Sequence, residues 1–163
     1  MTVRKVAVER FSVTSTALFE TVLGRIEAAI GHPDMTAFLA ALTAAPSFSA
    51  LEAVVAQATG ASGIMEFARF DLGAVLRKDR RDSGRILRLL IGNPVIMKQM
   101  AQHVRDVGSY APATILIDER GDGVHLSYDR MASLLAPYGS AQALEVARGL
   151  DEKIEHLLTA AAR

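Results

Sequence analysis

The sequence contains no cysteine and no tryptophan, and aromatic residues make up only 6% of its 163 positions. Without cysteine the chain can form neither disulfides nor thiolate metal sites, and it has no cysteine nucleophile. Because the absence of disulfides fits a reducing compartment, we expect a cytoplasmic protein. Lysine plus arginine equals aspartate plus glutamate at 18 each, so no net charge favours nucleic acid or an anionic membrane as a partner.

Long apolar runs are also missing from the sequence. Its start, MTVRKVAVERF, alternates charged and apolar residues, and arginine interrupts the apolar stretch RILRLLIG. Neither resembles a secretory signal or the roughly 20 apolar residues that span a bilayer. Half of the residues are nevertheless hydrophobic and 22% are charged, as in globular proteins. We therefore expect residues 1–163 to fold as a single domain around one core.

The first part of the chain predicts two strands separated by three helices. Alternating residues predict strands over 3–13 and 64–71, and apolar residues at every fourth position predict a helix over 18–30. Between them lies an alanine-rich helical pair over 34–60, with Asp34 and a capping box at Ser49 as helix starts. We interpret this pair as an insertion whose apolar side chains must be covered by the core or by a second subunit.

The second part predicts a strand over 85–91 that turns abruptly into a helix over 94–107, because Asn93 is a good N-cap and proline a good first helical residue. Two short strands over 113–119 and 124–128 flank a glycine-rich hairpin turn. Ser140 then caps a last amphipathic helix.

This order of elements predicts an α+β fold, a two-layer α/β sandwich with a mixed, mainly antiparallel sheet. We expect the helices to pack on one face of the sheet, with the inserted helical pair added. The other face would then be open to solvent or would form a dimer surface.

The motifs of the second part resemble a bacterial family known as domain of unknown function 302. The resemblance rests on Gly92-Asn93-Pro94, a methionine-bearing helix, a strand led by Pro112, Asp122-Gly123, Ser127-Tyr128-Asp129 and Tyr138-Gly139. It covers residues 65–158 and the opening strand and helix, whereas typical members lack residues 34–60. It implies a two-layer fold and a homodimer, with no assigned activity, cofactor or catalytic residue. The chain departs from the family at Ala111-Pro112 and Asp129-Arg130-Met131, so a site built by those turns would differ.

The turn before residue 94 is the place where we expect a ligand site. Free N–H groups at a helix N-terminus can hold a small anion, three tyrosine hydroxyls could converge there, and a strand histidine could act as a general base. Ordinary capping, packing and solvent exposure are the more common explanations of the same residues. The candidate ligand-binding residues are Gly92, Asn93, Tyr110, Tyr128, Tyr138 and His125.

Metal, cofactor and nucleic-acid sites are not expected. The histidines His32, His103, His125 and His156 show no metal-ligand spacing, and nucleotide-binding motifs are missing. Met97, Met100 and His103 share a helix, which makes a haem carrier a third, weaker hypothesis because such spacing usually marks a core. The basic cluster at 77–82 contains two aspartates, which lower its net positive charge, so we do not expect it to bind nucleic acid.

Two functions from different classes fit the sequence. The first is a homodimeric small-molecule-binding or interaction domain without catalysis, favoured because the familiar catalytic motifs are absent. The alternative is a small enzyme that acts on an anionic metabolite at the helix N-terminus, with Asn93, Tyr128 and His125 as its polar groups. A convergent polar pocket with a perturbed histidine would favour an enzyme, and a buried helix pair or sheet face in a dimer would favour the first function.

Overall fold

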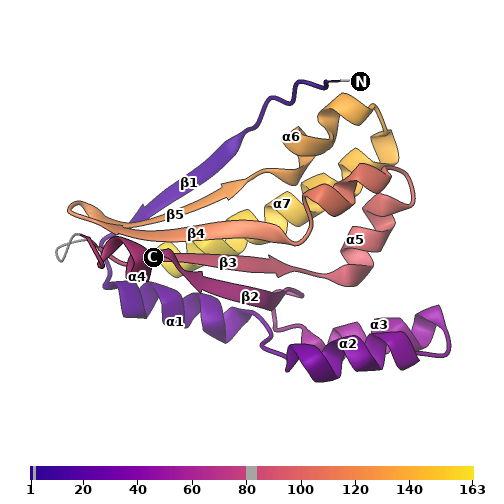
Figure 1. Ribbon diagram of the computed structural model, residues 1–163, viewed down its shortest axis with the longest axis horizontal. Coiled ribbons are helices and arrows are strands. Elements are labelled where there is room, and N and C mark those ends of the chain that lie inside the picture. The colour runs from indigo at the N-terminus through magenta and orange to yellow at the C-terminus, as the bar shows by residue number, and fades with distance from the viewer. Residues whose placement is uncertain (2, 80–83) are drawn as a thin grey trace.

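The computed structural model describes residues 1, 3–79 and 84–163. Its strands form one five-stranded sheet in the order β1-β5-β4-β3-β2, and every neighbouring pair is antiparallel (Figure 1). The prediction of an α+β two-layer sandwich is confirmed, with a fully antiparallel rather than a mixed sheet among these strands. The strands are β1 (Arg10–Ser15), β2 (Met65–Asp71), β3 (Ile86–Gly92), β4 (Ala113–Arg120) and β5 (Gly123–Asp129).

The main core lies between one face of this sheet and three helices, α1 (Phe19–Ala29), α5 (Pro94–Ala101) and α7 (Ala141–Ala162). Alternate residues of the central strands point inward, and Leu89, Ile115 and Leu126 are completely buried. They meet the apolar stripe of α7, including Ile154 and Leu158. Because burying each such side chain contributes about 1.5–3 kcal/mol, this one layer of contacts dominates the stability of the fold.

The predicted helical pair is present as α2 (Met35–Ala44) and α3 (Phe48–Ala58), which project from the sandwich in Figure 1. Phe38 and Val55 form a second, small cluster with Met65, so the chain itself supplies much of the apolar cover. The prediction that Ser49 starts the second helix is wrong. Ser47 is the N-cap, and its hydroxyl accepts a 3.2 Å hydrogen bond from the N–H of Ala50.

The helical pair leaves the sandwich and returns to it at one point. The N–H groups of Gly31 and Gly60 both donate to the carbonyl oxygen of Ile64, at 2.9 and 3.0 Å. A Cβ on Gly31 would lie 1.9 Å from the carbonyl oxygen of Ala58, so only glycine allows this approach. An excursion with adjoining ends is the geometry that an insertion needs, and the insertion itself stays a prediction.

Two element bounds differ from the predicted ones. β1 begins at Arg10 rather than near residue 3, because β5 ends at Asp129 and offers no longer edge to pair with. α5 ends at Ala101, and the 3-10 turn η1 (Arg105–Ser109) follows it. Two short helices, α4 (Leu72–Leu76) and α6 (Met131–Leu135), follow β2 and β5.

The outer face of the sheet carries alternating side chains such as Arg88, Leu116 and Ser127, which are exposed or half-buried. At one end of this face, β4 and β5 part. Their ladder ends at the pair Ile115 and Tyr128. Beyond this pair, β4 continues to pair with β3 as far as Ala113, and β5 continues to pair with β1 as far as Asp129. We call this place the parted end, where the next pair of the ladder would join Thr114 to Asp129.

Candidate functional site

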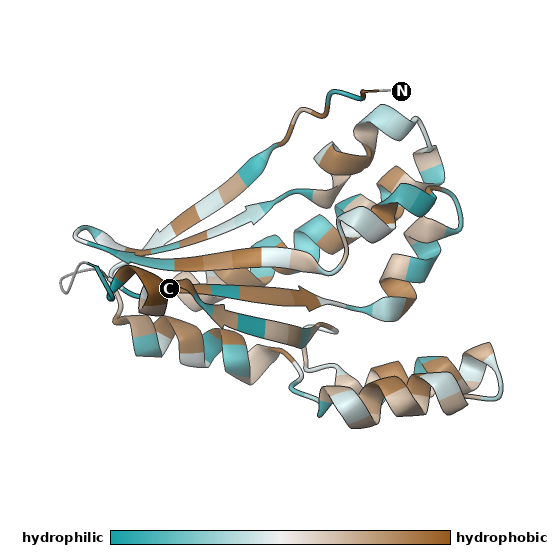
Figure 2. Cartoon of the chain, in the orientation of Figure 1, coloured by the Kyte–Doolittle hydropathy of each residue, from teal (hydrophilic) through white to brown (hydrophobic). Residues whose placement is uncertain are grey.

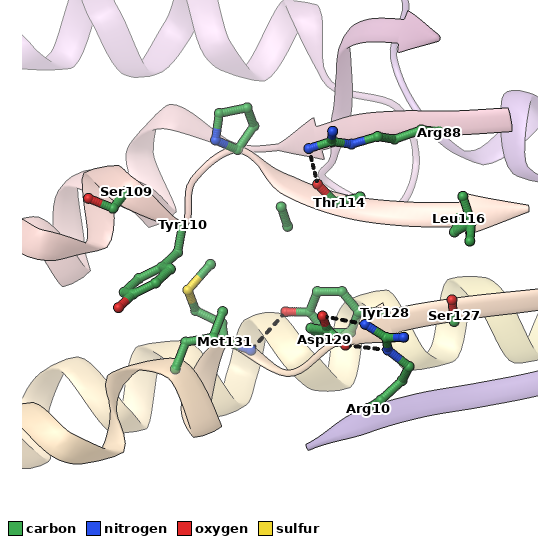
Figure 3. Close-up of a pocket in the computed structure, with 13 residues that line it drawn as sticks. Arg10, Arg88, Ser109, Tyr110, Thr114, Leu116, Ser127, Tyr128, Asp129 and Met131 are labelled. Carbon is green, nitrogen blue, oxygen red and sulfur yellow. Dashed lines mark hydrogen bonds and ion pairs between the residues drawn. The ribbon is translucent and has the colours of Figure 1, made fainter. Parts of the chain in front are cut away.

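A cavity of about 420 Å³ lies at the parted end, on the outer face of the sheet (Figure 3). The strands supply its floor, and η1 and α6 supply its walls. We call it the split cavity, because it exists where the two strands separate. It is lined by Arg10, Arg88, Ser109, Tyr110, Pro112, Ala113, Thr114, Leu116, Ser127, Tyr128, Asp129, Met131 and Leu134.

The charged groups of the split cavity are two arginines and one aspartate. Nε and a terminal nitrogen of Arg10 donate to the two carboxylate oxygens of Asp129 at 2.6 and 2.9 Å, and this partner raises the pKa of Arg10. Arg88 makes one hydrogen bond, to the hydroxyl of Thr114 at 3.3 Å, and no carboxylate of the described residues pairs with it. The lining therefore carries one uncompensated positive charge.

The lining also contains hydroxyl groups, one of which contacts Arg88. Because Thr114 accepts the hydrogen bond from Arg88, its own hydroxyl hydrogen remains free to donate. The hydroxyl of Ser127 has no hydrogen-bond partner within the described part of the chain, so it is also free. The hydroxyls of Tyr110 and Tyr138 lie 3.1 Å apart, and this hydrogen bond raises the pKa of Tyr110. The cavity thus offers several donors next to a cation.

The opposite side of the split cavity is apolar, with Pro112, Met131 and Leu134. Behind it lies a second cavity of about 120 Å³, which shares Pro112, Ala113 and Met131 with the first. We call it the apolar cavity, because most of its walls are hydrocarbon side chains. Its other lining residues are Phe67, Ile91, Gly92, Asn93, Pro94, Met97, Met100, Ala111 and Leu150.

A buried carboxylate supports the parted end from below. Asp151 of α7 is only 6% exposed, and its Oδ1 accepts 2.7 Å hydrogen bonds from the Tyr128 hydroxyl and from the N–H of Met131. Its Oδ2 accepts from the N–H of Ala132 at 3.1 Å. Burial raises the pKa of Asp151, and burial together with the Asp151 charge raises that of Tyr128. Asp151 thereby fixes where α6 begins.

The structure brings most of the predicted site residues into one region but divides them between the two cavities. Tyr110 and Tyr128 line the split cavity, and Tyr138 reaches it through the hydroxyl of Tyr110. Gly92 and Asn93 line the apolar cavity instead. The hydroxyl of Tyr128 donates a hydrogen bond to Asp151. It also accepts one from the N–H of Met131, which Figure 3 shows as a dashed line.

The side chain of Asn93 is used as an N-cap. Its Oδ1 accepts from the N–H groups of Val95 and Ile96 at 2.8 and 3.3 Å, and its Nδ2 donates to the carbonyl oxygen of Gly63 at 2.9 Å. Two of the N–H groups that could hold an anion at this helix start are therefore occupied. As a ligand-binding residue, Asn93 stays a prediction.

His125 lies away from both cavities, towards the hairpin end of β5. Its Nε2 lies 2.8 Å from a carboxylate oxygen of Asp122, and its Nδ1 lies 3.2 Å from the hydroxyl of Thr14. Strand alternation alone could not place it, because the two ends of one strand look alike in a sequence. Within the described residues no three histidine or carboxylate side chains gather as metal ligands would.

Sequence reasoning did not select Arg10, Arg88, Thr114, Ser127 or Asp151 as ligand-binding residues, although Ser127 belongs to one of the motifs of the family resemblance. The first four share the outer face of the sheet, which their alternation could have shown. Asp151 was the more detectable, because it interrupts the apolar stripe of α7 between Ala147 and Ile154. Of the basic cluster at 77–82, residues 80–82 lie outside the described part, and Arg77 pairs with Asp71 at 2.9 Å.

Both the sequence and the fold of this chain are similar to those of known proteins. The family described as "Domain of unknown function DUF302" matches residues 40–161. A crystal structure of an uncharacterized conserved protein DUF302 from Bacillus stearothermophilus has the same fold, with a TM-score of 0.66 and 14% sequence identity. The similarity covers 94% of this chain and 98% of that one. No curated protein matches the chain. No helix in the described part has the length and apolar character needed to cross a membrane.

Proposed function

The chain belongs to the DUF302 family, as the resemblance in its motifs predicted, and we propose that it is a small-molecule-binding domain without catalysis. We further propose that it acts as a cytoplasmic homodimer. The observation that carries the proposal is the split cavity, whose volume of about 420 Å³ is within the range of ligand pockets. It combines a few polar groups with an apolar side, which is the usual composition of such pockets.

The polar groups of the split cavity suit binding better than catalysis. Its single carboxylate, Asp129, is engaged by two bonds from Arg10, and its lining contains no histidine. A general base or an activated nucleophile would need a free acceptor next to the reacting atom. The alternative, an enzyme at the Asn93 helix start, has less support because the amide of Asn93 is occupied and His125 lies elsewhere.

Native mass spectrometry of the protein purified from its own host tests the binding function. Binding predicts a defined extra mass that remains with the protein under gentle ionisation and leaves on unfolding. A protein that carries no small molecule from its host, and takes up none from a metabolite extract, would contradict the proposal.

The surface area of the single chain supports the homodimer. The chain exposes 9433 Å², whereas a compact monomer of 17.5 kDa exposes about 7,900 Å². The excess of about 1,500 Å² is larger than the roughly 800 Å² that each partner buries in a stable dimer. Four exposed apolar side chains lie together at the end of β2 and on α4, which is brown in Figure 2. They are Phe70, Leu72, Val75 and Leu76, with exposed fractions of 39–72%.

We assign this β2–α4 patch to a second copy of the chain. Val75 is its most exposed member, so Val75→Glu should turn the dimer into a monomer by placing a charge in the interface. Leu39→Glu, on an exposed position of α2, is the control and should leave the dimer intact. Analytical ultracentrifugation measures both. Loss of the dimer with Leu39→Glu alone would move the interface to the helical pair, and a monomeric wild type would contradict the homodimer.

A further inference from the structure

We propose that the ligand of the split cavity is an organic monoanion with an apolar portion, whose carboxylate is held by Arg88. This inference rests on the proposed function, because it names the ligand class for the same cavity. The apolar portion would pack against Pro112, Met131 and Leu134. Arg88, a charged side chain with unused donors inside a cavity, is the observation from which the ligand class follows.

The position of Arg88 prepares it to bind a carboxylate. On β3 it lies between Phe70 of β2 and Leu116 of β4, so apolar neighbours flank its aliphatic stem. One terminal nitrogen donates to Thr114, and no other described residue accepts from the five N–H donors of the guanidinium. A planar guanidinium with free donors binds a carboxylate through two parallel hydrogen bonds.

The surroundings of Arg88 reinforce this preference. The free hydroxyl hydrogens of Thr114 and Ser127 lie in the same lining and can donate to an anion. Asp129, the only carboxylate of the lining, is neutralised by Arg10 at 2.6 and 2.9 Å and does not cancel the charge of Arg88. A net charge of plus one matches a monoanion, whereas a phosphate dianion would be left half neutralised.

The apolar half of the cavity determines what the anion must carry. Pro112, Met131 and Leu134 offer no side-chain donor, so a fully polar ligand would lose hydration there without replacement. Met131 also borders the apolar cavity, and its unbranched side chain adapts readily to different shapes. A hydrocarbon group therefore has room on the side away from Arg88.

A titration with three probes tests separately what the carboxylate and the hydrocarbon chain contribute to binding. Octanoate carries both the anion and the chain, octanol only the chain, and acetate only the anion. We expect octanoate to bind at least about tenfold more tightly than either of the others, since a charge-assisted pair adds to apolar burial. Two-dimensional ¹H–¹⁵N NMR should show the shifts at the Nε–H of Arg88 and at the amides of Thr114 and Met131.

Two matched variants test whether Arg88 is the residue that binds the carboxylate. Arg88→Gln should weaken octanoate about tenfold and leave octanol unchanged. Arg120→Gln, at the far end of β4 where the arginine pairs with Asp118, should leave both unchanged. Both arginines are largely exposed, and the amide spectrum of each variant reports whether it is folded.

The outcomes distinguish this inference from the proposed function. If octanol binds in the split cavity as tightly as octanoate, and Arg88→Gln changes neither, the cavity is a ligand site but the monoanion is wrong. If acetate and octanoate bind equally, the apolar portion is wrong. If none of the probes, nor a metabolite extract, shifts the cavity amides, both the inference and the binding function are overturned.

Discussion

The two ends of the β4–β5 pair differ in how their charged groups are used. At the hairpin end, Arg85 is bonded to Glu119 at 3.0 Å, also contacts Glu20, and lies 4.3 Å from the ring centre of Phe19. Arg85 directly precedes β3, and Arg88 lies three residues further along the chain, within β3, in the lining at the parted end. Among the described residues, Arg88 has one neutral hydrogen-bond partner, Thr114. Both ends hold ion pairs, since Arg10 is bonded to Asp129 at the parted end, but only the parted end has an arginine, Arg88, that pairs with no carboxylate of the described residues.

The two arginines therefore have different roles, one in the stability of the fold and the other in what a ligand can contact. Arg85 satisfies two carboxylates, which raise its pKa, so its loss would leave them without a partner. Arg88 satisfies none among the described residues, so its loss costs the fold little. An arginine that is held in a cavity without stabilising the fold is the kind of residue expected at a binding site.

The largest expected effect comes from removing the carboxylate beneath the parted end. Asp151→Ala leaves the Tyr128 hydroxyl and the N–H groups of Met131 and Ala132 buried without an acceptor. We expect the free energy of unfolding to fall by about 3 kcal/mol, as measured by urea denaturation. Glu152→Ala, on the exposed neighbouring position, is the control. A loss below about 1 kcal/mol would mean that Asp151 does not hold the parted end together.

A smaller effect separates the two arginines. Arg85→Gln should lower the free energy of unfolding by about 1 kcal/mol, and the loss should shrink in high salt because the pair with Glu119 is partly exposed. Arg88→Gln should change the stability by less than about 0.5 kcal/mol. Thermal and urea unfolding of both variants at low and high salt measure the difference. Equal losses would remove the distinction between the two ends.

The smallest expected effect is a pH dependence of stability, because the causes acting on Asp151 oppose one another. Burial raises its pKa, and its three hydrogen bonds act in the opposite direction, with burial the stronger. The folded chain therefore binds a proton more readily than the unfolded chain, so stability falls as pH rises from the ordinary aspartate pKa to the raised one.

Asp151→Asn tests this sign. The amide cannot titrate, so the variant should lack the fall in stability that the wild type shows across that pH range. Urea unfolding of both proteins from about pH 3 to about pH 6 gives the difference. A wild type that gains stability over the variant as the pH rises would show that the pKa of Asp151 is lowered.

Much of the fold followed from local patterns, and much of the site did not. Alternation predicted the strands, and Asn93 with Pro94 marked the start of α5 correctly, because caps act within one turn of a helix. The parted end depends on where β4 stops pairing with β5, which no local pattern records. The contact of Asp151 with Tyr128 joins residues 23 positions apart and required the fold to be known.

The most direct test of the ligand site fills the split cavity. Ser127 faces it from β5 on the outer face of the sheet, so Ser127→Phe should occupy the space without disturbing the core. Thr14→Phe is the matched control, because Thr14 of β1 also lies on the outer face of the sheet but does not line the cavity. In native mass spectrometry of host-purified protein, we predict an extra mass on the wild type and on Thr14→Phe that Ser127→Phe lacks. The same extra mass on all three proteins would place the ligand elsewhere and contradict the account.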